Sequence, residues 1–146
     1  MNNQTHVSVI YINASPTEVW EALTSSEFTR QYWHNTNIKS DWRTNSPVTF
    51  YNQDRSIAVE GIIIESDKPN RLKYSWHVHY NPIAKQETPS TVTFQLEAHG
   101  DSTGLTVIHD GFPQDSVVFP QIDKGWIMIM SNLKTLLETG KAMAIS

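Results

Sequence analysis

The 146-residue sequence contains no cysteine, which excludes disulfide bonds, thiolate zinc sites, iron–sulfur clusters and cysteine nucleophiles. It also lacks a long hydrophobic run, because its longest strictly apolar stretch, Trp126–Met130, is far shorter than the ~18 residues that suggest a membrane span. Basic residues are few and scattered, with 11 Lys and Arg against 15 Asp and Glu and a net charge of −4. We therefore expect no nucleic-acid partner, no transmembrane segment and no attraction to anionic membranes.

The amino terminus, Met1–Thr5, shows neither the basic region nor the apolar region of a secretion leader. Together with the absence of cysteine, this predicts a cytoplasmic protein. No internal repeat or linker divides the chain, and a length near 150 favours one unit. We expect residues 1–146 to form a single domain.

Aromatic residues are what this sequence has in quantity, with five each of Trp, Tyr and Phe. Such large rings need an apolar environment, so the chain has the material for a sizeable core or for the wall of a pocket.

The amino-terminal third predicts a strand followed by two short helices. Residues 6–13 alternate apolar and polar side chains, which is typical of a strand. The sequence Ser15-Pro16-Thr17-Glu18 is a strong helix start, because Ser15 can cap, Pro16 suits the first turn and Glu18 can complete a capping box. A second short helix is expected over 26–33, capped by Ser25 or Ser26.

The middle of the chain predicts an antiparallel sheet with one covered face. Strands are expected around 48–52, 57–65, 71–79, 91–98 and 105–109, with a hairpin connection at 100–104. The clearest alternation places Leu72, Tyr74, Trp76 and Val78 on an apolar face. The face of Glu60 stays undetermined, since the consecutive isoleucines at 62–64 obscure the alternation.

A long carboxy-terminal helix is predicted to start between 115 and 121 and to end at Gly140. Its apolar stripe is formed by Ile122, Trp126, Ile129, Leu133 and Leu136. The expected fold is α+β, a curved antiparallel sheet wrapped around this helix, with two short helices after the first strand. Such an arrangement often leaves a cavity between the sheet and the helix.

Five stretches carry a resemblance to a known family. They are Ala14–Thr24, Tyr32-Trp33, Pro69–Leu72 followed by Tyr74 and Trp76, Leu105–Phe112, and Gly125-Trp126 with Leu133–Glu138. In this order, from about residue 6 to 140, they resemble the helix-grip superfamily (START-like, SRPBCC, birch pollen allergen-like). The more specific resemblance is to the branch of the carboxy-terminal domain of the heat shock protein 90 ATPase activator. One departure is that Arg43–Pro47 stands where family members often carry a glycine pair.

This resemblance implies binding of a hydrophobic small molecule or lipid in the cavity. An alternative that it also implies is a co-chaperone-like module whose partner is the chaperone heat shock protein 90. A second alternative is cyclase-like or hydrolase-like chemistry in the same cavity, although an enzyme is the less expected outcome.

Strand parity and helix spacing select the candidate ligand-binding residues. Tyr74, Trp76 and Phe94 share their face with His109, and the helix opposite contributes Trp126 and Met130. Tyr32 and Trp33 are expected at the rim. For His109 two interpretations stay open, a core histidine bonded to a neighbour or a polar anchor for a ligand.

No catalytic residue, metal or cofactor is predicted. The G-x-S-x-G pattern at 100–104 lies between two strands, whereas a nucleophile elbow needs a strand-to-helix turn. His77 and His79 form an H-x-H pair on the polar face, but no third metal ligand is evident in the sequence. Glu60 and Asp110 have no evident catalytic partner, and no G-x-G-x-x-G motif is present.

Overall fold

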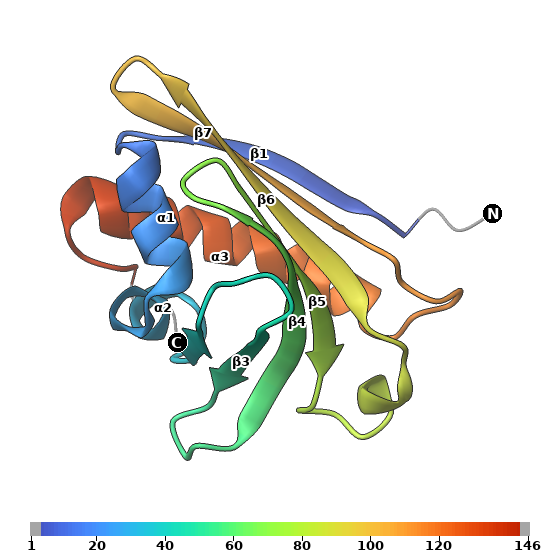
Figure 1. Cartoon of the computed structure of the whole chain (residues 1–146). Helices are drawn as coiled ribbons and strands as arrows, with labels where there is room; N and C mark the ends of the chain where they lie inside the picture. The colour runs from blue at the N-terminus through green and yellow to red at the C-terminus, as the bar shows by residue number, and fades with distance from the viewer. Residues whose placement is uncertain (1–3, 144–146) are drawn as a thin grey trace.

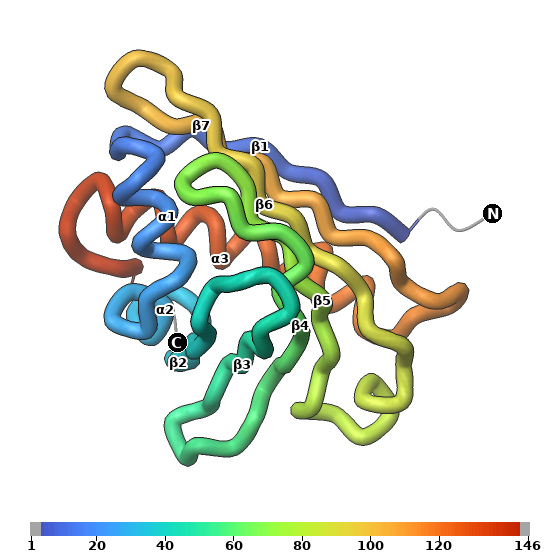
Figure 2. Tube along the Cα trace, viewed as in Figure 1, coloured from blue at the N-terminus to red at the C-terminus, as the bar shows by residue number. Residues whose placement is uncertain are grey.

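The computed structural model describes residues 4–143. Met1–Asn3, which belong to the amino-terminal stretch considered above as a secretion leader, and residues 144–146 lie outside the described residues. The strands are β1 (His6–Ile12), β2 (Asn37–Ser40), β3 (Pro47–Tyr51), β4 (Ile57–Asp67), β5 (Arg71–Val78), β6 (Ser90–His99) and β7 (Ser102–Asp110). They form one antiparallel sheet in the order β1-β7-β6-β5-β4-β3-β2, whose path is followed most easily in the trace of Figure 2. The sheet is open, with β1 and β2 at its edges.

The helices are α1 (Pro16–Thr24), α2 (Ser26–Tyr32) and α3 (Phe119–Thr139), with a short 3-10 turn at Ala84–Gln86. Figure 1 shows the sheet curving around α3, while α1 and α2 cover one end of the molecule. This arrangement confirms the α+β helix-grip architecture predicted from the sequence. In the part of the chain that the structure describes, no helix has the length and apolar character needed to cross a membrane.

The predicted helix boundaries rest on local chemistry that the structure reproduces. Glu18 N donates to Ser15 Oγ at 3.2 Å, and Ser15 N donates to Glu18 Oε1 at 3.0 Å, which completes the capping box. At the other end of the chain, Gly140 closes α3 with a left-handed backbone, φ 82°.

The sheet buries its aromatic face as the alternation predicts. In β5, Leu72, Tyr74, Trp76 and Val78 are all buried, and the intervening side chains are partly exposed. On the neighbouring strand Val92 and Phe94 are also buried. The core therefore lies between this face and the apolar stripe of α3.

Strand β4 is irregular, and this irregularity explains why the face of Glu60 was undetermined. The register shifts between Phe50 and Tyr51 on β3 and between Ile63 and Glu65 on β4, which marks two bulges. Between them Glu60 pairs with His77, on the face of the sheet that points away from α3. Period-two reasoning fails at bulges, because each extra residue reverses the alternation.

Gly61 is the one position in this strand where the backbone requires a glycine. A Cβ atom there would come within 1.8 Å of the Ser75 carbonyl oxygen. Ile62 N donates to Ser75 Oγ at 2.9 Å in place of a regular ladder bond. The close approach of β4 and β5 at this point positions the residues on either side of it.

The short edge strand β2 was not expected from the sequence. It follows a turn in which His34 and Asn35 both adopt left-handed backbone conformations, with φ of 51° and 56°. A four-residue strand after such a turn is too short to establish a recognisable alternation.

Candidate functional site

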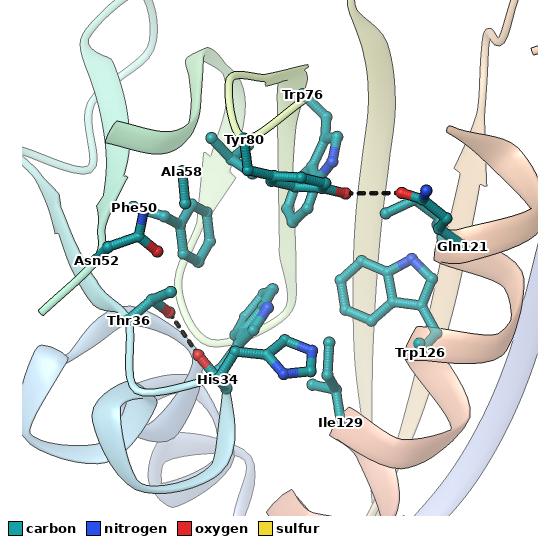
Figure 3. Close-up of a pocket in the computed structure, with 14 residues that line it drawn as sticks. His34, Thr36, Phe50, Asn52, Ala58, Trp76, Tyr80, Gln121, Trp126 and Ile129 are labelled. Atoms are coloured by element: carbon teal, nitrogen blue, oxygen red, sulfur yellow. Dashed lines mark hydrogen bonds between the residues drawn. The ribbon is translucent and has the colours of Figure 1, made fainter. Parts of the chain in front are cut away.

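A cavity of about 400 Å³ lies between the sheet and α3. Its walls come from β3, β4 and β5 on one side and from α3 on the other, and the turn after α2 and the loop after β5 complete it (Figure 3). Its lining includes Trp33, Trp76, Tyr80, Gln121, Gly125 and Trp126. This volume falls in the range of small-molecule sites.

Aromatic rings pack against one another to form most of the wall. The ring of Trp33 lies 4.7 Å from that of Phe50 and 5.4 Å from that of Trp126, centroid to centroid. Trp76 lies 5.8 Å from Trp126 across the space between sheet and helix. These separations are typical of favourable aromatic contacts, so the wall is held in place by its own packing.

The polar side chains at the cavity come from turns and from the exposed side of α3, and sequence reasoning missed them. They are His34, Thr36, Asn52, Tyr80 and Gln121. Tyr80 Oη donates to Gln121 Oε1 at 3.3 Å, which links the loop after β5 to α3 (Figure 3). A polar residue in a turn carries no periodic signal, so only proximity in space reveals it.

The Trp76 indole is a buried donor without an acceptor. Trp76 lines the cavity, and among residues 4–143 its Nε1–H group has no hydrogen-bond partner. An indole N–H can only donate, and leaving a buried donor unpaired costs about 1–3 kcal/mol. Trp76 also borders a separate hollow of about 10 Å³, which is near the lower limit for one water molecule.

His109 has both ring nitrogens occupied by neighbouring side chains. Trp126 Nε1 donates to His109 Nδ1 at 3.0 Å, so Nε2 carries the proton and donates to Ser90 Oγ at 2.7 Å. Burial, with a smaller contribution from His6, lowers the pKa of His109 to about 3. The neutral ring is therefore built into the core, where it orients the Trp126 indole that lines the cavity.

The structure divides the sequence-predicted site residues into two layers. Trp33, Trp76 and Trp126 line the cavity. Tyr74, Phe94, His109 and Met130 are buried but are not among the residues that line it. Parity selects the correct face of a strand, yet it does not tell which residues on that face border an open space and which pack behind it.

Tyr32 is the last residue of α2 and does not line the cavity. Its hydroxyl donates to the Ala22 carbonyl at 2.6 Å, which satisfies one of the carbonyl groups left open at the end of α1. Burial raises the pKa of the Tyr32 hydroxyl far above its usual range. The ring borders a different hollow, together with Met128 and Asn132 of α3.

The G-x-S-x-G pattern belongs to the β6–β7 hairpin. Ser102 begins β7 and Gly104 lies within it, so the serine stands between two strands and not on a strand-to-helix turn. Asp110 ends β7 and is exposed. We assign no catalytic residue at either place.

The chain matches one protein-family model. Residues 13–138 match the model described as Activator of Hsp90 ATPase homolog 1-like protein. No curated protein sequence matches the chain.

Several solved structures share the fold at low sequence identity. Protein MLL2253 from Mesorhizobium loti is 21% identical, with a TM-score of 0.77, over 92% of this chain and 96% of that chain. The Aha1 dimer from Colwellia psychrerythraea is 19% identical, with a TM-score of 0.75, over 94% and 98%. PFC0360w from Plasmodium falciparum, described as an HSP90 activator, is 17% identical, with a TM-score of 0.74, over 92% and 96%.

Proposed function

The chain belongs to the family of Activator of Hsp90 ATPase homolog 1-like proteins, and we propose that its cavity binds an apolar small molecule that carries a hydrogen-bond acceptor. The observations that support this proposal are a 400 Å³ aromatic-walled cavity and the unpaired indole N–H of Trp76, a wall residue whose N–H is buried and meets an acceptor in the cavity once the ring turns towards it. The ligand body would replace water against the rings, and its acceptor would pair the indole.

The shape of the cavity supports a ligand with a flat apolar body. Trp33 and Trp76 stack at 6.2 Å with an angle of 18° between their planes, and Trp126 stands nearly edge-on to Trp33. Flat rings arranged in this way offer both faces and edges to an aromatic or polycyclic guest. No Asp, Glu, Lys or Arg side chain lines the cavity among the described residues, so an uncharged ligand fits better than an ion.

We expect 2-acetylnaphthalene, which carries a carbonyl acceptor, to bind about 2- to 10-fold more tightly than 2-ethylnaphthalene, which has no acceptor. This difference corresponds to one neutral hydrogen bond of about 0.5–1.5 kcal/mol. The variant Trp76→Phe keeps an aromatic ring but removes the donor, so it should bind both probes with similar affinity. Isothermal titration calorimetry on the wild type and the variant measures the four affinities.

Two results would overturn this proposal. Absence of saturable binding of both probes would remove the cavity as a ligand site. Equal affinity of the wild type for both probes would show that no bound acceptor pairs the Trp76 N–H group.

The family description favours a second candidate function, binding to heat shock protein 90 as a co-chaperone-like module. A surface suited to a protein partner exists on the edge strand β1, where Val7, Val9 and Tyr11 are exposed and share the face away from α3. If this function holds, the chain should raise the ATPase rate of heat shock protein 90. The double variant Val9→Ser/Tyr11→Ser should then lose this stimulation, whereas no change in ATPase rate with wild-type chain would exclude the function.

A further inference from the structure

We propose that Glu60, His77 and His79 form a binding site for a divalent transition metal ion such as Zn²⁺. Glu60 and His77 lie on the face of the sheet opposite the cavity, and His79 lies in the segment directly after β5. One ligand atom from each side chain lies within 4.8 Å of the other two. The sequence offered only the H-x-H pair, and the third ligand becomes visible through the pairing of Glu60 with His77 across β4 and β5.

The side chains already converge in the structure. His79 Nε2 lies 2.8 Å from Glu60 Oε1, and the rings of His77 and His79 are 4.8 Å apart, centroid to centroid. A tetrahedral zinc site with bonds of about 2 Å needs ligand atoms about 3.3 Å apart, so small side-chain rotations suffice to close the site. The Glu60 side chain is 44% exposed, which leaves its carboxylate free to rotate and to take up an ion from solvent, whereas the His79 side chain is only 14% exposed.

A hydrogen bond from His77 selects the nitrogen that can ligate. His77 Nε2 lies 2.7 Å from the backbone carbonyl oxygen of Lys85. A carbonyl only accepts, so Nε2 carries the proton and Nδ1 of the neutral ring keeps its lone pair. Ligating histidines in known metal sites are oriented by the same kind of bond to a carbonyl or carboxylate.

His79 presents the opposite nitrogen. Its Nε2 atom is buried and has no directed hydrogen bond to any described residue, although Glu60 Oε1 is close enough for an ion pair. A metal ion that reaches this nitrogen would therefore displace no directed hydrogen bond to a described residue. The backbone amide of His79 donates to the Ala58 carbonyl at 2.8 Å, so the residue is anchored to β4.

The donor set decides the chemical class of the ion. Two imidazole nitrogens and one carboxylate oxygen suit Zn²⁺, Ni²⁺ and Cu²⁺, whereas Ca²⁺ and Mg²⁺ prefer sites made of oxygen. Three protein ligands leave a fourth tetrahedral position for water, as in open zinc sites. The site adjoins the cavity wall, since Val59 and Tyr80 line the cavity and are the chain neighbours of Glu60 and His79. A bound ion would tie β4 to the segment that carries Tyr80.

Zinc binding to the metal-free full-length chain tests the proposal. We expect one Zn²⁺ per chain by calorimetry in a non-chelating buffer, and no comparable heat from Mg²⁺. The variants Glu60→Gln, His77→Gln and His79→Gln should each weaken zinc binding by at least about 10- to 100-fold, the loss seen when even an outer-shell partner is removed. His99→Gln is the matched control, because His99 also lies near a carboxylate, at 4.0 Å from Glu97, but belongs to no group of three potential ligands among residues 4–143.

Nitrogen-15 NMR of the histidine rings gives a readout that a folding defect would not imitate. Zinc should shift His77 at Nδ1 and His79 at Nε2, and leave both nitrogens of His109 unchanged. Zinc bound to the wild type no more tightly than to His77→Gln would overturn the proposal, as would an equal loss in His99→Gln. Ring shifts confined to other histidines would overturn it too.

Discussion

Replacing His109 by alanine should lower the free energy of unfolding by about 3–5 kcal/mol, the largest effect on stability that we expect for a single polar side chain here. The His109 side chain is fully buried and is bonded on both sides, to Trp126 Nε1 and to Ser90 Oγ. Its removal leaves the buried Trp126 indole N–H unpaired, at about 1–3 kcal/mol, and opens a cavity in the core, while the Ser90 hydroxyl keeps only its 3.5 Å bond to the Trp76 carbonyl. Urea unfolding followed by circular dichroism measures the change.

The exposed His99 provides the control for this prediction. His99→Ala removes the same ring from the surface and should change stability by no more than about 0.5 kcal/mol. If His109→Ala were as stable as His99→Ala, the hydrogen bonds among Ser90, His109 and Trp126 would not contribute to the free energy of unfolding. His109 would then have to be reconsidered as a group held for a ligand.

The same histidine should make stability depend on pH in a defined direction. The pKa of His109 is lowered from 6.5 to about 3 by burial, so the unfolded chain takes up a proton near pH 6.5 that the folded chain does not bind. The contribution of His109 to the free energy of unfolding is fully present above pH 6.5. It is lost progressively as the pH falls towards 3, by up to about 1.4 kcal/mol per pH unit. His109→Gln, which cannot titrate, should show a flatter dependence over this interval when both proteins are unfolded in urea.

The main architecture was predictable because it depends on patterns that repeat. The alternation in β5 and the three- and four-residue spacing along α3 both extend over several turns or pleats, so a local irregularity does not erase them. The start of α1 was equally clear, because capping is chemistry within four residues. These are the features for which sequence and structure agree.

The site was less predictable because it depends on interruptions of those patterns. The bulges of β4 reverse the alternation on either side of Glu60, so the pairing of Glu60 with His77 could not be predicted from the sequence. Tyr80 and His34 reach the cavity from a loop and a tight turn, where no periodicity applies. His109 had the correct parity, but only coordinates show that Trp126 and Ser90 already use both of its nitrogens.

The cavity itself can be tested through Gly125, the residue of α3 that leaves part of it open. Apart from its chain neighbours and the backbone of its own helix, no described atom lies within 4 Å of a Cβ built at Gly125, and the residue lines the cavity. Gly125→Leu should therefore fit without a clash and project its side chain into the ligand space. We expect the affinity for 2-acetylnaphthalene to fall by about 10-fold or more, since a loss of 1.4 kcal/mol of contact already gives that factor.

The free energy of unfolding of these variants should rise while the probe affinity of Gly125→Leu falls. This combination distinguishes a filled cavity from a damaged fold. A glycine inside a helix costs about 0.5–1 kcal/mol relative to alanine, so both Gly125→Ala and Gly125→Leu should unfold at higher urea concentration than the wild type. Gly125→Ala adds a single methyl group and should retain most of the binding, which makes it the matched control for size. Undiminished probe binding by Gly125→Leu would place the ligand outside this cavity. Loss of binding in Gly125→Ala and Gly125→Leu alike would point to the helix backbone, not to the volume beside it.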